Sequence, residues 1–528
     1  MRISIILMLF LCVFVNSYLY ADEEDTDKMF MEAGGKISTI SVDGKRIKYY
    51  SYDKNGKSTF ENNLAKRNFT VSISNINGRE KLLKKLLENF QDFVYLKHVQ
   101  AISINIEESK LPQILRKIMT QFSVRDIVKT PYKNVFSKKL IFDKAIHSSE
   151  VSTYSPNDPL FKSQWYLYNE NNPNVDIGFL SYRKFIAETN YKPQFANPPV
   201  VAVLDVGIFY DSNELRDRIY INTNEIPNNG IDEDDNGYAD DYMGVDVGHP
   251  ECTLLACIDN YNEHHGTAMA SIMGAKTDNN YYMSGILPDE VKIMPVSASY
   301  DYTQVDRYNE GYEYLLEMKE RGVNIISVNV SAGGPFDPTE YRLLKEFYDA
   351  GILVVAAAGN EDINIDIDRG IGSEDFTRAY PAKYDLNNVI AVSAYDENGQ
   401  VASFANYGDT VDIYMPGVNI ISLAYPERPG YVAIGSGTSQ AAAIASGLVG
   451  VAAYLYPDCN PIELRSLILE SAVEPIGQFV VRSRSLLSFL TSQTFTMEGA
   501  KISSVDGVGL ITDGKLQNYY CGTYGIGW

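Results

Sequence analysis

The sequence predicts an α/β protein with a doubly wound parallel sheet, preceded by a small α+β domain. Beyond about residue 200, apolar runs of strand length alternate with stretches of helical periodicity, which is typical of parallel sheets covered by helices. The expected strands of this sheet are Val200–Leu204, Val323–Val330, Ile352–Ala358 and Val389–Ser393. The expected helices are Gln304–Glu320, Pro338–Tyr348, Gln440–Tyr456 and Pro461–Ser471. Reactive groups in such sheets lie just past the carboxyl ends of the strands.

The smaller domain is expected at about residues 66–130, where shorter elements follow one another. Its strand patterns are Phe69–Ser74, Ala101–Ile106 and Val124–Val128, and its helical patterns fall in residues 82–90 and 111–122. The order strand, helix, strand, helix, strand predicts a compact α+β sandwich of the ferredoxin-like kind. Residues 131–155, which follow it, are expected to form a polar linker.

The composition indicates a soluble globular protein and argues against one class of function. Of the 528 residues, 45% are hydrophobic and 22% are charged, so the chain can form more than one apolar core. The formal net charge of −22 argues against a nucleic-acid-binding protein, because such a protein needs basic surface to neutralise phosphates. The excess carboxylates either solubilise the surface or bind calcium, and composition alone leaves both open.

The N-terminus has the features of a secretory signal. A basic second residue precedes the apolar run Ile3–Val15, whose thirteen residues are too few for a bilayer span of about 20 but suit a signal peptide. Cleavage is expected after Ser17 or Ala21, which assigns residues 1–21 to the signal. No membrane anchor is expected later, because the nearest candidate, Ala441–Leu455, is better explained as a buried helix. The protein is therefore expected to be secreted or to enter a secretory-pathway organelle.

Cysteine usage agrees with export into an oxidising compartment. Of five cysteines, Cys12 leaves with the signal and four remain, an even number. Cys252 and Cys257 are close in the sequence and are the first choice for a disulfide. Cys459 and Cys521 then form a second pair or are both free, since the sequence does not determine the connectivity.

Short segments along the chain carry the groups that an acyl-transfer site requires. Asp205 ends a buried strand and His265 begins a helix of small residues, so a carboxylate can orient an imidazole base. Ser439 opens an alanine-rich helix, whose dipole and first N–H groups favour negative charge near its hydroxyl. Ser331 and Asn360 follow two further apolar strands. The sequence therefore predicts a serine nucleophile with an acid, a base and polar donors close by.

The chain order Asp205, His265, Ser439 resembles that of the subtilisin-like serine endopeptidases, the subtilase family. Residues 157–165 are similar to the usual start of the mature enzyme in that family. Residues 228–241 resemble a stretch found in secreted bacterial subtilases and in the subtilisin-like proteases of apicomplexan parasites. The resemblance implies a serine endopeptidase that acts on protein or peptide substrates.

The same resemblance implies a subtilisin-like catalytic domain at residues 156–490 and leaves the tail, residues 491–528, without a role. Asn360 is expected to donate its side-chain amide to the oxyanion, with the Ser439 N–H as the second donor. Ser331, Ala332 and Gly333 are expected to offer an edge strand to an extended substrate. Ala379 is expected to line the pocket for the substrate side chain next to the cut.

Residues 22–155 are implied to be a propeptide, with its folded core at about 66–130 and the linker behind it. In the family such a segment helps the enzyme to fold, is cut off by the enzyme itself and stays bound as an inhibitor. The chain's own propeptide is therefore an expected partner. The mature enzyme is expected to be a monomer, to bind no nucleic acid and to lack a transmembrane anchor.

Two calcium sites are expected, which makes Ca²⁺ the expected cofactor. The first is an acidic loop with oxygen donors at alternate positions and a glycine at the turn, as in an EF-hand loop without its flanking helices. Its candidate ligands are Asp232, Asp234, Asn236, Tyr238, Asp240 and Asp241. The second site is implied by resemblance to the tight calcium site of the family. Its candidate ligands are Gln164, Glu214, Asp278 and Asn280.

Two other functions stay open at this point. A catalytically weak or inactive binding protein on the same fold is one, although the intact set of Asp205, His265, Asn360 and Ser439 argues against it. A calcium-binding adhesion module explains the acidic loop but none of the other segments. The chain also departs from the family pattern at Val206, where Ser or Thr usually bonds the catalytic Asp; this predicts a more loosely held Asp205.

Overall fold

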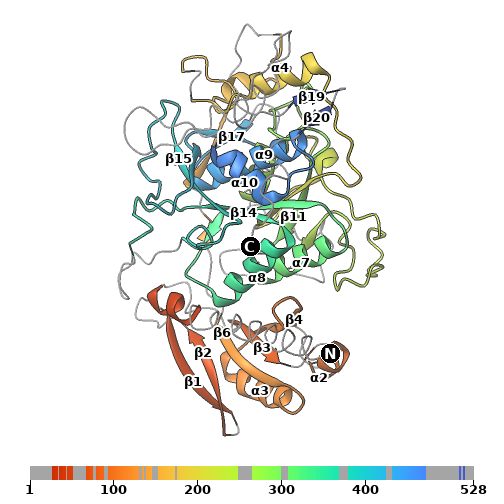
Figure 1. Ribbon diagram of the computed structural model, residues 1–528, viewed down its shortest axis with the longest axis vertical. Helices are drawn as coiled ribbons and strands as arrows, with labels where there is room; N and C mark the ends of the chain where they lie inside the picture. The colour runs from red at the N-terminus through yellow and green to blue at the C-terminus, as the bar shows by residue number, and fades with distance from the viewer. Residues whose placement is uncertain are drawn as a thin grey trace, which may run out of the picture. The chain divides into compact units, whose positions relative to one another are not determined.

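The computed structural model describes residues 26–33, 35–42, 44–51, 67–74, 76, 79–87, 93–129, 134–135, 138–144, 153–172, 175–247, 265–298, 307–367, 379–423, 431–470, 510–512 and 515–517. The chain divides into two compact units (Figure 1). Unit 1 comprises residues 1–132, 334–342 and 368–378, and unit 2 comprises residues 133–333, 343–367 and 379–528. The expected signal peptide lies outside the described residues.

Unit 1 contains a six-stranded sheet with the order β1-β2-β6-β3-β5-β4 and two helices packed against it. Its strands are β1 (Lys36–Val42), β2 (Lys45–Ser51), β3 (Arg67–Ser74), β4 (Phe93–Leu96), β5 (Ala101–Ile106) and β6 (Ser123–Lys129). The helices are α2 (Glu80–Leu87), the short η2 (Glu108–Lys110) and α3 (Leu111–Met119). From β3 to β6 the elements follow the βαββαβ order expected of a ferredoxin-like sandwich.

The hairpin β1–β2 adds to this sandwich next to β6, and the sequence did not reveal it. Most of the side chains of its strands are exposed or half-buried and many are charged or polar, so the strands lack a continuous apolar face. The buried residues of unit 1 come mainly from alternate positions of β3 and β5 and from the apolar faces of α2 and α3. The short elements therefore form a core of their own.

Unit 2 is built on a seven-stranded sheet with the order β10-β11-β9-β12-β14-β15-β16. Every neighbouring pair of strands in it is parallel. The strands are β9 (Val200–Asp205), β10 (Val245–Asp246), β11 (Lys292–Ser297), β12 (Ile325–Val330), β14 (Leu353–Ala357), β15 (Val389–Tyr395) and β16 (Ile413–Pro416). The chain proceeds from β9 to both sides, so the predicted doubly wound sheet is confirmed.

Three strands of this sheet were not predicted. Pro295 lies within β11 and Pro416 ends β16, and a proline in a run argues against a strand because it offers no N–H to the ladder. β10 has only two residues, too few for any period to be visible. The four predicted strands are all present, with ends within two residues of the expected ones.

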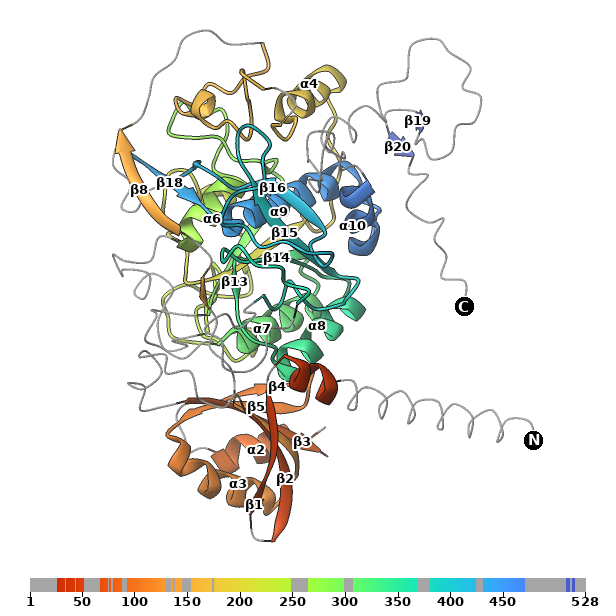
Figure 2. The ribbon, with the colours of Figure 1, turned by 90° about the vertical axis from the view of Figure 1, so that its left-hand side faces the viewer.

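Helices cover both faces of the sheet, with α6 and α9 on one face and α7 and α8 on the other (Figures 1 and 2). The helices are α4 (Phe179–Thr189), α6 (His265–Gly274), α7 (Tyr308–Glu320), α8 (Pro338–Ala350), α9 (Thr438–Leu455) and α10 (Pro461–Glu470). Gly311 of α7 packs over Leu204 and Val296, while Val201 and Val203 share a core with α6 and α9. Alternate residues of β9 therefore face opposite layers.

Helix α9 runs through the interior of unit 2, and all 18 of its residues are buried. Among the described helices it alone has the length and apolar composition of a membrane span, yet its whole length is enclosed by protein. The interpretation of this segment as a buried core helix is confirmed. Small residues make the burial possible, since alanines and glycines let α9 approach the sheet and α6 closely.

Smaller elements complete unit 2, and two of them lie where a polar linker was expected. These elements are β7 (Asn134–Val135), β8 (Lys138–Lys144), η3 (Phe161–Ser163), η4 (Arg216–Arg218), β13 (Ala332–Gly333), β17 (Ile420–Ser422), β18 (Tyr431–Ser436), β19 (Leu510–Thr512) and β20 (Lys515–Gln517). β7 pairs antiparallel with β13, and β8 pairs antiparallel with β18. The segment 131–155 is therefore not a simple linker. Its strands depend on partners far away in the sequence, which periodicity does not reveal.

Arg218 of η4 ties the end of α6 to the loop before β11. Its side chain is 1% exposed and pairs with Asp289 at 2.6 Å. It also donates to the carbonyl oxygens of Gly274, Leu287 and Pro288 at 3.1, 3.0 and 2.7 Å. A buried guanidinium with four acceptors holds the helix that carries His265 in place.

Replacing Arg218 with Met should therefore destabilise unit 2. The change leaves buried carbonyl groups without donors and should cost about 1–3 kcal/mol, the penalty for leaving a buried acceptor unsatisfied. The matched control is Arg216→Met, since the Arg216 side chain is 54% exposed in its pair with Asp211 and should matter little. Thermal unfolding of both variants checks this, and equal midpoints would contradict the anchoring role of Arg218.

Candidate active site

Three predicted residues lie at element ends that the topology brings toward one edge of the sheet. Asp205 is the last residue of β9, where the strand order reverses, and His265 is the first residue of α6. Ser439 is the second residue of α9, which packs beside α6. Gly266 permits the close approach of α6 to β9, because a Cβ there would lie 2.2 Å from the Gly207 carbonyl oxygen.

Asp205 and His265 form a buried carboxylate–imidazole pair. The Nδ1 atom of His265 lies 2.9 Å from each carboxylate oxygen of Asp205, and His265 and Asp205 are 7% and 1% exposed. An ionised carboxylate only accepts hydrogen bonds, so the proton of a neutral imidazole resides on Nδ1. Nε2 is then the basic nitrogen; it is buried and has no hydrogen-bond partner among the described residues.

The backbone also holds Asp205. The N–H of Val206 donates to Oδ1 of Asp205 at 2.8 Å. The Val206 side chain lacks the hydroxyl that the resemblance leads one to expect at this position. The Val206 backbone N–H is the donor to Asp205 here. The prediction that Asp205 is held more loosely than in relatives stays a prediction.

Ser439 and Ser331 are tied to each other by reciprocal hydrogen bonds. The Ser439 hydroxyl donates to the carbonyl oxygen of Ser331 at 3.1 Å, and the Ser331 hydroxyl donates to the carbonyl oxygen of Ser439 at 3.2 Å. Ser331 directly follows β12 and precedes β13, so these bonds fix the start of α9 against the proposed substrate-binding edge. The bond between Ser439 and His265 that a catalytic triad requires stays a prediction.

Two further buried residues extend this contact. Nδ2 of Asn329 donates to the Ser331 hydroxyl at 2.9 Å, and the Ser446 hydroxyl donates to Oδ1 of Asn329 at 3.0 Å. Both lie in the interior, with 0% exposure. Each is a polar residue within an otherwise apolar element, Asn329 in a strand and Ser446 in a helix. Because buried polar groups are nearly always hydrogen-bonded, this pattern could have predicted that the two residues have buried partners.

Asn360 is oriented by Thr438. Its Oδ1 accepts hydrogen bonds from the backbone N–H and the hydroxyl of Thr438, at 2.9 and 3.1 Å. The Thr438 hydroxyl in turn accepts from the N–H of Gly359 at 3.0 Å. Because these bonds engage the oxygen end of the Asn360 amide, the nitrogen end, Nδ2, is the end that can donate to a substrate oxygen. Thr438 was not singled out from the sequence, although it sits beside the nucleophile.

The predicted substrate-binding residues are buried and mostly small. Ser331, Ala332 and Gly333 lie at the edge strand β13, which is next to β14. Ala379 is 1% exposed and packs in one apolar cluster with Ala358, Ile363 and Ile365. A small apolar cluster, to which Ala379 belongs, therefore follows the end of β14.

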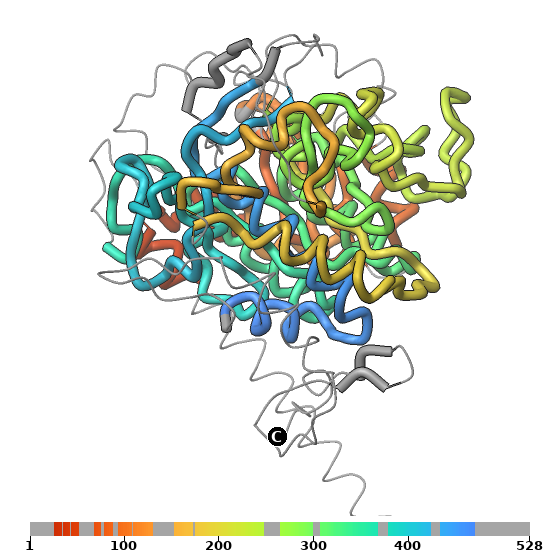
Figure 3. The backbone as a smooth tube through the Cα atoms, turned by 90° about the horizontal axis from the view of Figure 1, so that it is seen from above, coloured from red at the N-terminus to blue at the C-terminus, as the bar shows by residue number. Residues whose placement is uncertain are grey.

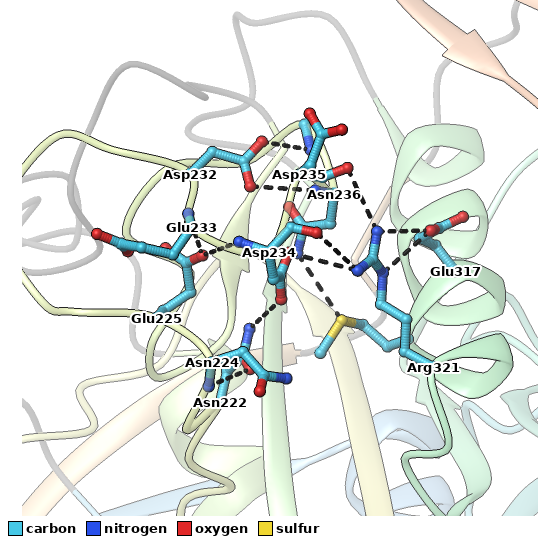
Figure 4. A network of polar contacts seen from close by, with 12 residues as sticks. Asn222, Asn224, Glu225, Asp232, Glu233, Asp234, Asp235, Asn236, Glu317 and Arg321 are labelled. Atoms are coloured by element: carbon cyan, nitrogen blue, oxygen red, sulfur yellow. Dashed lines mark hydrogen bonds and ion pairs between the residues drawn. The ribbon is translucent and has the colours of Figure 1, made fainter.

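The acidic loop of residues 222–241 is the second candidate site, and it extends at the right-hand margin of the view in Figure 3. Glu225, Asp232 and Asp234 each offer a carboxylate oxygen within 4.8 Å of the others, and they are the described acidic residues that converge closely enough to hold a metal ion. Figure 4 shows this group beside Arg321 and Glu317 of α7. Carboxylates held this close repel one another unless a cation lies between them.

The chemistry of this group fits a calcium ion. Oδ1 of Asp234 is buried without a hydrogen-bond donor among the described residues, and the nearest cation, Nη1 of Arg321, is 3.7 Å away. Burial raises the pKa of Glu225, while N–H groups of Asp234 and Glu233 oppose the rise. Three oxygen ligands are a partial shell for calcium, which takes six to eight.

The other expected ligands of this loop make different contacts. Asp240 accepts the N–H groups of Asn229 and Gly230, and Asp241 accepts from Asn222, Asn236 and Tyr314. The ring of Tyr238 packs edge-on against Tyr314. Of the four acidic residues among the expected ligands, the structure thus brings together Asp232 and Asp234, and it adds Glu225, which the alternating pattern did not include.

In the part of the chain that the structure describes, the hydrogen bonds and ion pairs of the second expected calcium site join its residues to neighbours outside the expected set. Gln164 bonds both backbone groups of Ser284 through its amide, at 2.7 and 2.9 Å. Oε2 of Glu214 accepts from Asn279 at 3.2 Å, and Asp278 pairs with Arg183 at 2.8 Å. The N–H of Asn280, the fourth expected ligand, donates to Asn157. An ion pair to Arg183 does not favour a ligand role for Asp278. The expected pair Cys252–Cys257 lies outside the described residues.

Comparisons with known proteins agree with this arrangement. Residues 197–509, more than half of the chain, match the family model described as "Subtilase family". Subtilisin DY of Bacillus licheniformis is 32% identical over 213 residues, which are 39% of this chain and 70% of the relative. The extracellular basic protease of Dichelobacter nodosus is 25% identical over 348 residues, 60% of this chain and 52% of the relative.

A solved structure supports the likeness of fold. The crystal structure of fervidolysin from Fervidobacterium pennivorans, a keratinolytic enzyme related to subtilisin, superimposes with a TM-score of 0.57. The match has 18% sequence identity and covers 86% of this chain and 64% of that chain. At this identity the similarity concerns the fold alone.

The contacts of Thr438 lead to a test of how Asn360 is positioned. Thr438→Val removes the hydroxyl that bonds Oδ1 of Asn360 and should slow acylation of Ser439 about tenfold, since small misplacements at a reacting centre are costly. Thr438→Ser keeps the hydroxyl and should react within about twofold of the unaltered protein. The rate of Ser439 labelling by a fluorophosphonate measures both; equal loss in the two variants would exclude this role of the hydroxyl.

Proposed function

Because the chain belongs to the subtilase family and is a serine endopeptidase, we propose that it is a secreted zymogen that processes itself and then cleaves extended protein substrates through an acyl-enzyme on Ser439. The observation that carries the proposal is the buried pair of Asp205 and His265 at the strand-order reversal, with the Ser439 helix packed beside it. Relatives of this chain include extracellular proteases, which supports secretion.

In the proposed reaction, Nε2 of His265 takes the proton of the Ser439 hydroxyl while the oxygen attacks the substrate carbonyl. The hydroxyl first exchanges its bond to the Ser331 carbonyl for one to Nε2. His265 then gives the proton to the leaving amine, and a water repeats the sequence to hydrolyse the ester. Asp205 keeps the proton on Nδ1 and stabilises the imidazolium without being protonated itself.

The oxyanion is proposed to be held by Nδ2 of Asn360 and by the N–H of Ser439. Thr438 engages the oxygen end of the Asn360 amide, so the nitrogen end is the one directed elsewhere. First-turn N–H groups of a helix have no acceptor within the helix, and α9 begins at Thr438. Both donors would be oriented before the substrate arrives, which is the condition for effective stabilisation.

Calcium is proposed as a structural ion in the acidic loop. Glu225, Asp232 and Asp234 would hold it, and carboxylates with carbonyl and water oxygens are the ligands it prefers. The ion would neutralise the repulsion among the carboxylates of the loop. Arg321, which directly follows α7, holds the same loop by donating to the carbonyl oxygens of Asp234 and Asp235. The ion has no part in peptide cleavage.

Further parts of the proposal concern the exported form of the enzyme. Residues 1–21 would be a signal peptide, and unit 1 would contain the propeptide that inhibits the enzyme until it is degraded. Cys459 is the one cysteine among the described residues and is disulfide-bonded, which supports the pairing with Cys521 that we propose. The processed enzyme would act as a monomer.

Variants of Ser439 and Asn360 test the proposed chemistry. Ser439→Ala should abolish both peptide hydrolysis and fluorophosphonate labelling. Asn360→Ala should keep the labelling site but lower kcat by about 10²–10³, the cost known for the oxyanion amide of subtilisin itself. Peptide hydrolysis by the processed protein measures the effect. Full activity of Ser439→Ala would exclude Ser439 as the nucleophile. Absence of both labelling and hydrolysis in the processed protein would leave only a binding function.

Chelation tests the calcium site. Calcium at a hundred times its Kd should stabilise the fold by about 2.7 kcal/mol over the chelated protein. Glu225→Gln or Asp234→Asn should remove most of this response, whereas the exposed neighbour Asp235, changed to Asn, should keep it. Thermal unfolding with and without calcium measures the difference, and an equal response in all variants would exclude these ligands.

The same site predicts an effect of pH. Burial raises the pKa of Glu225, so its protonation favours the metal-free fold and competes with calcium. As the pH falls through this raised pKa, the metal-free protein gains stability from this group while stabilisation by calcium shrinks. Unfolding curves at several pH values should therefore converge on acidification, beginning above the pH at which an ordinary glutamate titrates.

A further inference from the structure

A cavity of about 340 Å³ lies in unit 2, near the end of α9 that is remote from Ser439. It is lined by one face of α4, by part of the chain between α6 and β11 and by Tyr454 of α9. Fifteen residues of helix separate Tyr454 from Ser439, a distance of about 22 Å along the helix axis. Ligand cavities have volumes of about 300–1,000 Å³, so this one has room for a small ligand or a single extended side chain. The cavity is therefore distinct from the proposed active site.

Four aromatic side chains line the cavity: Phe179 and Tyr182 of α4, Tyr191, which follows α4, and Tyr454. The ring centres of Phe179 and Tyr182 lie 6.4 Å apart, and those of Tyr191 and Tyr454 lie 5.8 Å apart. The faces of aromatic rings attract cations, because the ring electrons make these faces negative. The guanidinium carbon of Arg183 already lies 5.9 Å from the centre of the Phe179 ring. The aromatic lining therefore favours a cationic ligand with an apolar stem.

The hydroxyl of Tyr182 makes no hydrogen bond to any described residue, although the side chain is buried. Tyr182 is 6% exposed and lines the cavity. The other two tyrosines have partners: the Tyr191 hydroxyl donates to the Leu455 carbonyl oxygen at 2.9 Å, and the Tyr454 hydroxyl donates to the Tyr191 carbonyl oxygen at 3.2 Å. Buried hydroxyls are rarely left unbonded. The Tyr182 hydroxyl therefore indicates a ligand with a polar group that reaches this part of the cavity.

Most of the charged groups at the rim of the cavity are already paired. Arg183 pairs with Asp278 at 2.8 Å, and Asp289 pairs with the buried arginine of η4 at 2.6 Å. Glu290 and Lys192 also line the cavity; both are exposed, and neither forms an ion pair with a described residue. One negative and one positive charge are therefore left for a ligand.

Of these two charges, the Glu290 carboxylate acts on the buried tyrosines. Burial is the main cause of the raised pKa of Tyr182, and neighbouring groups, Glu290 among them, raise it further. Arg183 and Arg218 oppose this rise, but each of them is neutralised by an aspartate. Burial and Glu290 also raise the pKa of Tyr454. A carboxylate that disfavours ionisation of both phenols lies close enough to attract a cation beside them.

We propose that this cavity binds an arginine side chain of another protein. The guanidinium would lie against the aromatic rings and would donate hydrogen bonds to the Glu290 carboxylate and to the Tyr182 hydroxyl oxygen. Arginine suits this site better than lysine, because its guanidinium is planar, stacks on aromatic rings and carries five N–H donors in fixed directions. The net charge of −22 attracts basic partners over longer distances as well. The enzyme would thereby hold a basic protein at a point remote from the site of cleavage.

Calorimetric titration with N-acetyl-arginine amide tests the proposal on the full-length Ser439→Ala chain, which lacks the proposed nucleophile. This probe should bind at least about tenfold more tightly than N-acetyl-norleucine amide, which has a similar apolar stem without the charge. Glu290→Gln should weaken binding of the arginine probe about tenfold, and Tyr182→Phe should weaken it about threefold. Both changes nearly conserve the size of the side chain, so neither should unfold the protein.

Two exposed positions provide matched controls. Glu170→Gln removes a carboxylate that does not line the cavity and should leave the affinity for the arginine probe within about twofold. Lys192→Gln removes the unpaired positive charge of the lining and should leave the affinity unchanged or raise it. Equal weakening by Glu170→Gln and Glu290→Gln would mean unspecific attraction to an acidic protein and would overturn the proposal. Equal binding of the norleucine probe, or loss of binding in Lys192→Gln, would overturn it as well.

A kinetic experiment separates this site from the active site. At saturating concentration, the arginine probe should leave the hydrolysis of a short uncharged peptide by the processed enzyme unchanged, since about 22 Å of helix separate the cavity from Ser439. Competitive inhibition would locate the probe in the active site and would contradict the proposed cavity. If the processed protein hydrolyses no peptide, the proposed function fails, whereas the binding measurements still decide whether the cavity takes arginine.

Discussion

A buried charge on Asp205 is the constraint around which unit 2 is organised. A carboxylate that is 1% exposed needs partners, and this one has the Val206 N–H and the Nδ1–H of His265. These partners require that α6 begin directly beside the end of β9. Gly266 allows that approach, and Arg218 holds the other end of α6. The need to compensate one buried carboxylate therefore fixes where the whole helix lies.

The proposed nucleophile is held by a second, uncharged network. Ser439, Ser331, Asn329 and Ser446 link the start of α9, the end of β12 and the middle of α9 through hydrogen bonds that are wholly buried. Each bond adds only about 1 kcal/mol to stability, but loss of one partner leaves another group unsatisfied. Such a network favours one arrangement of the helix start over its alternatives, which a site for acyl transfer requires.

The sequence allowed prediction of the strands and helices that have a clear pattern of apolar residues within their own segment. It did not allow prediction of the strands that depend on pairing with distant segments. The strands β9, β12, β14 and β15 could be predicted from their apolar runs, because strands that are buried on both faces need continuous apolar sequence. β7 and β8 exist only through pairing with β13 and β18, hundreds of residues away. The same holds at the acidic loop, where alternating oxygen donors identified Asp232 and Asp234 but Glu225 comes from a turn near the start of the loop, outside the alternating pattern. The spacing of oxygen donors along the sequence predicts which residues belong to the loop. Which of these side chains converge on one point depends on the hydrogen bonds that each of them makes in the fold.

The shortness of β13 has a consequence for how this enzyme selects its substrates. Two residues can pair with only a short length of peptide, so strand addition at this edge alone provides little affinity. Binding must also draw on β18 and on the side chain next to the cut. A tethered segment avoids this weakness, because attachment to the same chain gives it an effective concentration in the millimolar range or above. In the proposed self-processing, a tethered segment therefore needs fewer contacts than a separate protein, which has to gain its affinity from a longer stretch of matched edge.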